Sequence, residues 1–537
     1  MMHRTCRRAT LHAFVALASL LSLGAAPAAA APPPTTEPGP APAARAMDAL
    51  LSAAFKPGEP GAAVIVAKDG KVLLRKGYGM ASLELGVRVD PGMVFRVGSV
   101  TKQFTATAIL MLAEEGKLRL DDPITNFLPG YPTHGQTITI EHLLTHTSGI
   151  KSYTDMPEWV PLWRKDMPLD SLIAVFKDQP ADFAPGEKWA YDNSGYVLLG
   201  AIIEKVSGRP YADFVRDRIF VPLGMTHTCY DTTESVVPGR VPGYLKDAGG
   251  WKHAQYLSMT QPYAAGSLMS SVDDLARWDA ALYTEKLLKR ASLERAWTPY
   301  VLKDGKSTGY GYGWTMSAVR GRPSIEHGGG INGFVSQTLR LPGHHVYVAI
   351  LTNRETGQPS PERLAAQLAA IAIGNPYAEP KPVALTASQM DALVGVYRIN
   401  EKEQRVIRRD GDRLFSQRSG GVKREIFALS PTEFYLKDSF TRLVFEKDSG
   451  GKVVSATAKA RYGPPEVAPK TDLPVPIERA AVTLAPDVLD RYVGKYELAP
   501  GFVLAVTHEG DSLMTQATGQ DKVEIFAESE TDRKSVV

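Results

Sequence analysis

Ser99 and Lys102 stand three residues apart at the start of a stretch, "GSVTKQFTATAILML", that becomes almost wholly apolar. In a helix beginning here, both side chains would lie on one face. A lysine so near a buried segment costs free energy unless its charge has a partner or a task. If burial lowers the pKa of Lys102, its neutral amine can take the proton of the Ser99 hydroxyl, and the helix N-terminus favours the negative charge that develops. The pair predicts nucleophilic catalysis by a serine.

The Ser-x-x-Lys spacing carries little weight by itself. Ser449 and Lys452 have it too, but their stretch "SGGK" is a Gly-rich turn that begins no helix and fixes no geometry. For Ser99 and Lys102 the alternative is a helix N-cap beside a surface lysine. Residues elsewhere in the chain have to decide between the two interpretations.

Two later stretches turn the pair into a candidate catalytic set. "WAYDNSGYVLLG" places Tyr191 and Asn193 two residues apart, on one side of an extended or looped segment before a helix beginning near Gly195. "IEHGGGINGFVSQ" puts His327 at the expected end of a strand, and the glycines after it would let the backbone approach a substrate.

At these positions the chain resembles the penicillin-recognising serine hydrolases. The signatures of that family are matched, in the same order, by Ser99-x-x-Lys102, Tyr191-x-Asn193 and His327-Gly328-Gly329. The stretches "LLTHTSGI", "AAGSLMSSVDDLARW" and "YGYGW" are similar to the class C β-lactamase branch with its related D-peptidases and esterases. The resemblance covers about residues 46–375. It implies a β-lactamase-like α+β domain that works through a serine acyl-enzyme, without metal or cofactor.

The resemblance also implies a role for each residue of the first two motifs. Ser99 would be the nucleophile that forms the acyl-enzyme. Lys102 and Tyr191 would share general acid–base work on the attacking hydroxyl, the leaving group and the later water. Asn193 would donate a hydrogen bond to the amide of the substrate's acyl side chain. As alternatives, Asn193 could cap the helix that follows it, and Tyr191 could be an aromatic at the edge of the core.

The third motif implies an oxyanion hole and contains the main departure from the family. The amides of Ser99 and Gly330 would bind the developing oxyanion, with Gly329 as a rival for Gly330. His327 stands where the best-known lactamases and transpeptidases carry a lysine, a fixed cation suited to a substrate carboxylate. Histidine is mostly neutral at pH 7, which favours esters or amides over carboxylate-bearing β-lactams or peptides. His327 could instead be a histidine with satisfied hydrogen bonds at a strand end.

We therefore expect a serine hydrolase that cleaves a small-molecule ester, amide, peptide or lactam. The alternative is a receptor or scaffold that binds penicillin or cell-wall peptide without turnover. His142 and His146 have an i, i+4 spacing able to hold zinc, but a third ligand and a Glu in His-Glu-x-x-His order are missing, so we expect no metal site there. The aromatic residues between Tyr153 and Trp163 are expected in the core, with a pocket wall as the alternative.

The order of strand-like and helix-like patterns predicts an α+β fold for residues 46–375. "AAVIVAKDGKVLLRKGYG" gives two apolar runs around Asp69-Gly70, a hairpin signal. Helical and turn-rich patterns follow, the helix that begins at Ser99 ending at Gly116. Strands return in "FVSQTLRLPGHHVYVAILTN" and a helix-like stretch closes the unit. One antiparallel sheet built from both ends of the unit, with helices packed on it and a helical subdomain, explains this order.

An internal repeat lies beyond this unit. Residue pairs that are identical at an offset of 99 include Gly395 and Gly494, Gly411 and Gly510, Leu414 and Leu513, Gln417 and Gln516, Ile426 and Ile525, and Phe427 and Phe526. We predict a linker at 376–390, a β-rich repeat at 391–463, a linker at 464–485 and a second, truncated β-rich repeat at 486–537. Repeats usually supply binding or scaffold surface, so a binding module at this end is a further functional alternative.

The first thirty residues differ in kind from the rest. Arginines at positions 4, 7 and 8 precede an apolar run and then small residues, the order of a secretory signal, and a Pro-rich linker follows at 31–45. We expect an exported protein, periplasmic or secreted, with no membrane span once residues 1–30 are removed; an uncleaved anchor is the alternative. The net charge of +3, without a basic stripe, gives no case for a nucleic-acid partner. The oligomeric state stays open.

Overall fold

The computed structural model describes residues 41–247, 249–437, 439–462, 465–476, 484–499, 502–510, 512–517, 523–527 and 533–535. The expected signal segment, 1–30, and residues 31–40 of the linker after it lie outside the described residues. Among the helices that are described, none combines the length and the apolar character needed to cross a bilayer.

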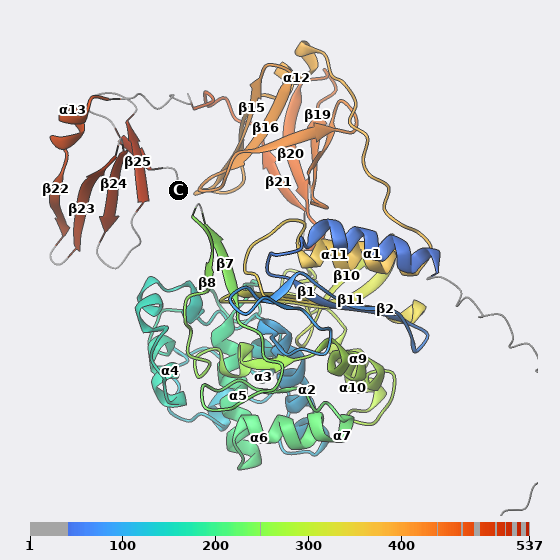
Figure 1. Cartoon of the computed structure of the whole chain (residues 1–537). Helices are drawn as coiled ribbons and strands as arrows, with labels where there is room; N and C mark the ends of the chain where they lie inside the picture. Colours follow the sequence, from blue (N-terminus) through green and yellow to red (C-terminus); the bar gives the residue numbers. More distant parts are fainter. Residues whose placement is uncertain are drawn as a thin grey trace, which may run out of the picture. The chain divides into compact units, whose positions relative to one another are not determined.

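A six-stranded antiparallel sheet forms the centre of the N-terminal domain (Figure 1). Its order is β10-β11-β12-β13-β1-β2. The strands are β1 (Ala62–Lys68), β2 (Lys71–Tyr78), β10 (Thr315–Val319), β11 (Arg322–Ile331), β12 (Phe334–Leu341) and β13 (Val346–Thr352). β1 pairs with β13, from Ala62 opposite Thr352 to Lys68 opposite Val346. The two ends of the domain thus meet inside one sheet, which confirms the predicted α+β fold.

The hairpin between β1 and β2 turns at Asp69 and Gly70. Both residues have positive φ, 50° and 73°, as a two-residue type I′ turn requires. β1 is buried on both faces: Val64 packs in the core beneath α1 (Pro42–Ala54) and α11 (Pro361–Ala372), and Ile65 packs in the core on the opposite face. Burial on both faces explains why the strand reads as a continuous apolar run rather than an alternating one.

A helical subdomain packs against the other face of the sheet. Its α-helices are α2 (Thr101–Glu114), α3 (Ile140–Leu144), α4 (Leu169–Phe176), α5 (Asn193–Ser207), α6 (Tyr211–Val215), α7 (Val221–Leu223), α8 (Tyr263–Gly266), α9 (Val272–Ala281) and α10 (Arg290–Ala296). The 3₁₀ helices are η1 (Gly98–Val100), η2 (Ile124–Asn126), η3 (Tyr153–Asp155), η4 (Pro157–Leu162) and η6 (Pro342–His344), and η5 (Arg216–Phe220) is a π-helix. Short strands are β3 (Met80–Ser82), β4 (Val87–Arg88), β5 (Phe95–Arg96), β6 (Cys229–Tyr230), β7 (Tyr244–Asp247), β8 (Gly250–His253) and β9 (Leu268–Ser270).

The central helix α2 differs slightly from the sequence prediction. Ser99 lies in η1, a 3₁₀ turn, and the α-helix itself runs only from Thr101 to Glu114. Side chains at i and i+3 also share a face in a 3₁₀ turn, so Ser99 and Lys102 keep the predicted relation. α2 is buried without a break from Thr101 to Leu112, which accounts for its apolar character all round.

The C-terminal region is β-rich. The first repeat extends past its predicted bounds, 391–463, at both ends. It consists of α12 (Ala387–Leu393) and one antiparallel sheet of eight strands: β14 (Gly395–Arg398), β15 (Gln404–Asp410), β16 (Arg413–Arg418), β17 (Arg424–Ala428), β18 (Glu433–Leu436), β19 (Arg442–Lys447), β20 (Val453–Lys459) and β21 (Glu466–Pro469). A bridge between Tyr397 and Lys470 joins its first and last strands, so the sheet is nearly closed.

The second repeat contains α13 (Pro486–Asp490), β22 (Gly494–Ala499), β23 (Phe502–Glu509), β24 (Ser512–Ala517), β25 (Val523–Ala527) and β26 (Arg533–Ser535). β24 and β25 begin and end 99 positions after β16 and β17. The sequence repeat is therefore also a repeat of secondary structure.

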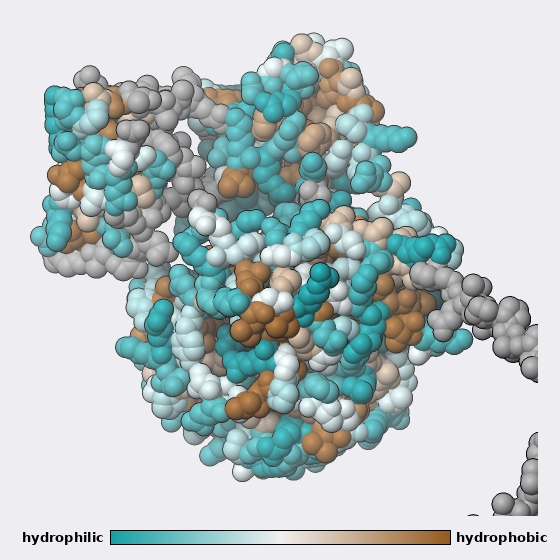
Figure 2. Space-filling view, in the orientation of Figure 1, coloured by the Kyte–Doolittle hydropathy of each residue, from teal (hydrophilic) through white to brown (hydrophobic). Residues whose placement is uncertain are grey.

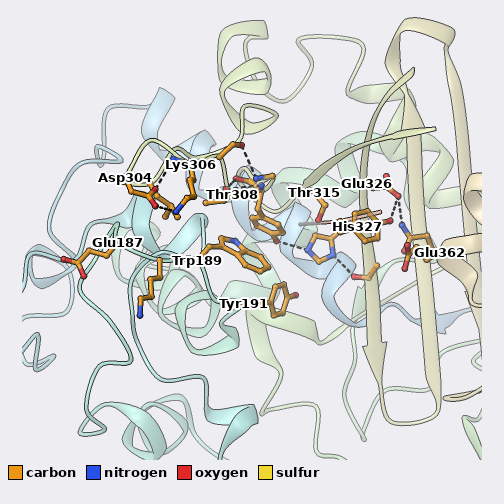
Figure 3. Close-up of a pocket in the computed structure, with 18 residues that line it drawn as sticks. Glu187, Trp189, Tyr191, Asp304, Lys306, Thr308, Thr315, Glu326, His327 and Glu362 are labelled. Carbon is orange, nitrogen blue, oxygen red and sulfur yellow. Dashed lines mark hydrogen bonds and ion pairs between the residues drawn. The ribbon is translucent and has the colours of Figure 1, made fainter. Parts of the chain in front are cut away.

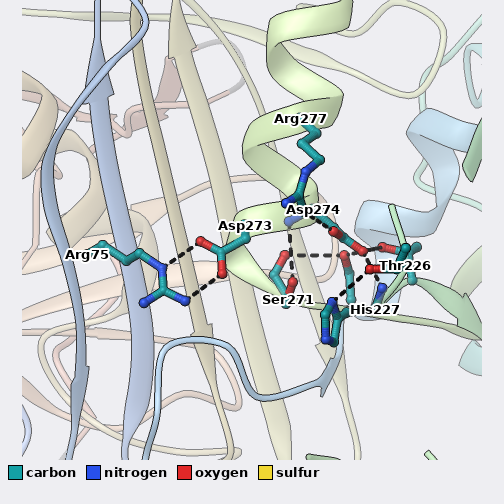
Figure 4. Close-up of polar contacts among 9 residues, drawn as sticks. Arg75, Thr226, His227, Ser271, Asp273, Asp274 and Arg277 are labelled. Atoms are coloured by element: carbon teal, nitrogen blue, oxygen red, sulfur yellow. Dashed lines mark hydrogen bonds and ion pairs between the residues drawn. The ribbon is translucent and has the colours of Figure 1, made fainter. Parts of the chain in front are cut away.

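The surface of the N-terminal domain is mainly polar on the face drawn in Figure 2, where apolar residues gather in small clusters. Charged side chains also fix helices to the sheet. Arg75 of β2 forms a two-bonded ion pair with Asp273 in the first turn of α9, at 2.7 and 2.6 Å (Figure 4). The next residue, Asp274, is buried and accepts hydrogen bonds from the His227 amide at 2.7 Å and the Thr228 hydroxyl at 2.9 Å.

These two neighbouring aspartates allow the stabilisation by a buried carboxylate to be compared with that by a partly exposed one. Asp274→Ala leaves buried donors without an acceptor and is expected to lower the free energy of unfolding by about 2–4 kcal/mol. Asp273→Ala removes the same charge from a partly exposed pair and is expected to cost about 0–1 kcal/mol. Denaturant unfolding followed by tryptophan fluorescence measures both; equal losses would contradict this account of how α9 is fixed.

Candidate active site

The amine of Lys102 is the centre of the candidate site. Its Nζ donates hydrogen bonds to Ser99 Oγ at 3.1 Å, to Asn193 Oδ1 at 2.7 Å and to the Ala265 carbonyl at 2.9 Å. The Lys102 side chain is completely buried, so it is not the surface lysine of the alternative interpretation. Nor does Ser99 act as a cap, because neither η1 nor α2 has a side-chain cap.

Burial also sets the protonation of this amine. It lowers the pKa of Lys102 to about 7, against the opposing effect of the negative charge on Asp192. The faces of Tyr191 and Tyr196 lie 4.8 and 5.3 Å from Nζ and offer a weak substitute for water around the charged form. A pKa near neutrality lets Lys102 be a neutral base in part of the molecules at pH 7, and the Ser99 hydroxyl is within its reach.

The start of α5 holds the second motif. The Asp192 side chain caps this helix by accepting from the Gly195 amide at 3.0 Å, so Asn193 is the first helical residue and not the cap. The Asn193 amide group donates to Thr154 Oγ1 at 3.0 Å while its oxygen accepts from Lys102. Asn193 thus helps to hold Lys102 and faces the same cavity as Ser99.

His146 packs against the second motif. It is buried, its Nδ1 accepts from the Asp192 amide at 3.0 Å, and its ring packs on the Tyr191 ring at a centroid distance of 4.3 Å. Burial lowers the pKa of His146 far below its usual value, so it packs as a neutral ring. Among the described residues there is no cluster of three or more side chains that could hold a metal ion.

Tyr191 presents a protonated phenol to the site. Burial raises its pKa well above the usual value for tyrosine, and the neighbouring Ser99 hydroxyl reduces that rise only in part. Its Oη is buried and has no hydrogen-bond partner among the described residues. An unpaired phenol with a raised pKa is suited to donate a hydrogen bond or a proton to a substrate atom, and it is a poor base at neutral pH.

His327 lies within β11 and not at a strand end, because the glycines after it continue the strand to Ile331. Its Nδ1 is 2.6 Å from the Gly328 carbonyl and its Nε2 is 2.8 Å from Tyr310 Oη. A carbonyl can only accept, so Nδ1 carries the proton and Nε2 accepts from the tyrosine. Burial, together with the positive charge of Lys102, lowers the pKa of His327 to about 3. His327 is therefore neutral and offers no fixed cation to a substrate carboxylate.

The glycines after His327 differ in what they permit. A Cβ on Gly329 would lie 2.0 Å from the Val97 carbonyl oxygen, so this residue must be glycine for β11 to pack against η1. A Cβ on Gly330 would meet nothing within 4 Å, and Gly330 is exposed. Only Gly330 lines the cavity that contains Ser99. Of the two rivals for the oxyanion hole, this geometry favours Gly330.

Two cavities divide the candidate residues between them. The smaller, about 230 Å³, is lined by Ser99, Asn193 and Gly330, with Tyr153 and Trp159 forming an aromatic wall. These two aromatic residues are buried in the core and also line the pocket, so both interpretations of them hold. Lys102 and Gly329 are buried and are not among the residues that line either cavity.

The larger cavity, about 790 Å³, is lined by Tyr191 and His327 and extends past both of them. Trp189 and Tyr191 lie on one side of His327, and Glu326 and Glu362 lie on the other (Figure 3). Tyr310, which binds His327, was not among the sequence candidates, nor was Ala265, whose carbonyl binds Lys102. Both stand in stretches that carried the resemblance, "YGYGW" and "AAGSL", but nothing in their residue types indicated a contact with the site.

The charge on Asp192 can be used to test the pKa of Lys102. If the neutral amine is the base, as we expect from the sequence, labelling of Ser99 by an activated acyl or phosphonate reagent should become faster as the pH rises, with a midpoint near 7. Asp192→Asn keeps a good N-cap but removes the charge that raises the Lys102 pKa, so the midpoint should move to lower pH. Asp182→Asn, an exposed carboxylate paired with Lys151, is the control and should leave it in place. A midpoint near the usual lysine pKa of 10.5 would refute the assignment.

Comparison with proteins of known sequence identifies relatives over most of the chain. The family model Beta-lactamase matches residues 43–373. Penicillin-binding protein 4* of Bacillus subtilis is 31% identical over 402 residues, which cover 70% of this chain and 87% of that protein. A D-aminopeptidase of Gluconobacter oxydans is 28% identical over 362 residues, 65% of each chain.

Solved structures show the same relationship. The octameric penicillin-binding protein homologue from Pyrococcus abyssi is 26% identical with a TM-score of 0.56, covering 79% of this chain and 99% of that one. A D-stereospecific amidohydrolase from Streptomyces sp. is 31% identical with a TM-score of 0.50, covering 58% of this chain and 94% of that one. The resemblance carried by the three motifs is confirmed: the chain belongs to the beta-lactamase family of serine hydrolases.

Proposed function

We propose that this serine hydrolase acts on esters and amides that carry no carboxylate near the scissile bond, through an acyl-enzyme formed on Ser99. The observation that carries the proposal is the 3.1 Å hydrogen bond between Lys102 Nζ and Ser99 Oγ, made by an amine whose pKa is lowered to about 7. A serine hydroxyl beside a base of matched pKa is an activated nucleophile.

The proposed reaction begins with neutral Lys102. As Ser99 Oγ bonds to the substrate carbonyl carbon, its proton passes to Lys102 Nζ, and the Ser99 and Gly330 amides receive the oxyanion. When the bond to the leaving group breaks, the leaving oxygen or nitrogen takes a proton from the Lys102 ammonium, with the Tyr191 phenol as a hydrogen-bond donor on that side. Water then attacks the acyl carbon, gives a proton to Lys102, and Ser99 recovers its hydrogen as the acid leaves.

The two cavities support separate binding sites for the acyl half of the substrate and for its leaving group. The cavity containing Ser99 and Asn193 has neutral walls, so the acyl half should be uncharged and of modest size. Because no carboxylate lines this cavity, a free α-amine on the acyl half would lack a counter-ion, and an N-acylated or unsubstituted acyl group fits better. The larger cavity beside Tyr191 and His327 would take the leaving group. The relatives named as a D-aminopeptidase and a D-stereospecific amidohydrolase make N-acylated D-amino-acid amides the first amides to try.

The covalent step has a direct test in the mass of the intact protein. The protein is mixed with an activated neutral acyl ester and quenched early; we expect one acyl increment in the wild type and none in Ser99→Ala. Ser449→Ala is the matched control, since Ser449 has the same Ser-x-x-Lys spacing in the exposed turn between β19 and β20, and it should acylate like the wild type.

The same experiment separates turnover from simple binding. Release of the acyl group over time supports a hydrolase, whereas an increment that persists without product would favour the receptor or scaffold alternative. Acylation of Ser99→Ala to the wild-type extent would refute the assignment of the nucleophile.

A second prediction concerns charge near the scissile bond. An amide with D-alaninamide as its leaving group should be cleaved with a kcat/KM at least about tenfold higher than the same acyl compound carrying D-alanine, because neutral His327 offers the carboxylate no cation beside the scissile bond; tenfold corresponds to about 1.4 kcal/mol. The measurement is the ratio of kcat/KM for the pair at pH 7.5. A ratio near one, or in favour of the acid, would contradict the role given to neutral His327.

The proposal also places the enzyme outside the cytoplasm. Its support is the signal-like order of residues 1–30 and the Pro-rich linker that follows.

A further inference from the structure

We infer that the first C-terminal repeat completes the larger cavity, and that its Tyr462 is a specificity-determining residue for the leaving group. The inference rests on the proposed acyl-enzyme reaction, which assigns this cavity to the leaving group. Among the described residues that line the cavity, Tyr462 alone comes from outside the segment matched by the family, 43–373. Tyr462 lines this cavity together with Glu326, Glu362, Tyr191 and His327. In Figure 3, Tyr191 and Glu362 lie on opposite sides of His327.

A buried ion pair holds this part of the repeat on the N-terminal domain. The Arg461 guanidinium donates to both oxygens of Glu326, at 2.8 and 3.0 Å, and the Tyr462 hydroxyl donates to Glu326 Oε2 at 2.6 Å. Ser317 of β10 donates to the Arg461 carbonyl at 3.0 Å. The side chains of Glu326 and Arg461 are 0% and 6% exposed. Two parallel bonds to one carboxylate fix orientation as well as distance, so the position of Tyr462 is specified.

The contact reaches the strand that carries the site. Glu326 precedes His327 in β11, and it also accepts from Ser324 Oγ at 2.7 Å and from Gln337 Nε2 at 3.2 Å. Gln337 lines the cavity on the neighbouring strand β12. The carboxylate of Glu326 therefore joins β11, β12 and the repeat into one wall, in which Tyr462 is the aromatic member that a long leaving group would meet.

Arg461 is the cation that pairs with buried Glu326, so the N-terminal domain depends on this part of the repeat being in place. A carboxylate buried without its guanidinium would cost free energy that the two remaining neutral donors cannot offset. The repeat is thus part of the cavity wall, and we do not expect it to be a detachable module.

The test uses the full chain and two esters with the same neutral acyl group, a methyl ester and a 4-phenylbutyl ester. Tyr462→Ala should lower kcat/KM for the long ester about three- to tenfold and leave the methyl ester within about twofold, because only the long leaving group loses an aromatic contact. Hydrolysis of the shared acyl-enzyme should not change. Tyr462→Phe keeps the ring and loses the hydrogen bond, so it should retain most of the preference for the long ester. Tyr435→Ala, a tyrosine of the same repeat outside the cavity, is the matched control.

The outcomes separate this inference from the proposed reaction. Equal losses on both esters, or none on either, would overturn the role of Tyr462 while leaving the acyl-enzyme intact. If Tyr462→Ala does not fold, Tyr462→Trp tests the same role. The larger side chain narrows the cavity, so it should lower kcat/KM for the long ester and leave the methyl ester unchanged.

A binding measurement is independent of turnover. In Ser99→Ala, free 4-phenylbutanol titrated by NMR should bind more weakly when Tyr462→Ala is added, and unchanged binding would overturn the inference even if no ester were ever hydrolysed.

Discussion

The rest of the site depends on the burial of a single amine. Lys102 is withdrawn from water completely, and its three hydrogen bonds end on residues of three separate elements: Ser99 in η1, Asn193 in α5 and Ala265 in α8. These bonds compensate the charged form, while the loss of water lowers the pKa to about 7. The same burial that makes the lysine costly gives it a pKa suited to a base at neutral pH, and its hydrogen bonds bring segments more than ninety positions apart to Ser99.

Two of the side chains around Lys102, Tyr191 and His327, are held in their neutral forms. Burial keeps the Tyr191 phenol protonated and His327 neutral, and the positive charge of Lys102 lowers the pKa of His327 further. Burial also raises the pKa of the Asp192 carboxyl to about 7, against several hydrogen bonds that oppose the rise. Because the phenol and the imidazole beside Lys102 stay neutral, the site favours neutral substrates, since a charge on the substrate would have to be desolvated beside them without a partner.

The first repeat belongs to this arrangement through Glu326. Breaking a buried ion pair by removing one partner costs about 3–5 kcal/mol, because the other charge stays buried. Truncation after about Pro380 would remove Arg461 and leave the Glu326 carboxylate buried without its cation, one residue from His327. Loss of turnover in a truncated chain would therefore not identify the repeats as a separate binding module, and substitutions within the full chain discriminate better.

The sequence by itself determined the chemistry and much of the fold. Local patterns specified the hairpin at Asp69-Gly70, the buried helix after Ser99 and the repeat at an offset of 99, because turn residues, apolar runs and identities are properties of short segments. Motif order led to the family. The prediction erred where a glycine run was taken to end a strand: β11 continues through Gly328–Gly330, since pairing with β12 outweighs the weak strand preference of glycine.

Only the tertiary structure decided how these residues act. That Lys102 is fully buried, that Gly330 is open while Gly329 is enclosed, and that His327 is neutral against Tyr310 all depend on what packs around them. Arg461 and Glu326 are 135 positions apart, and nothing in either local stretch marks them as partners. Desolvation and long-range pairing arise only when distant segments meet, so neither the pKa values nor the residues of the cavity walls could be predicted from the sequence.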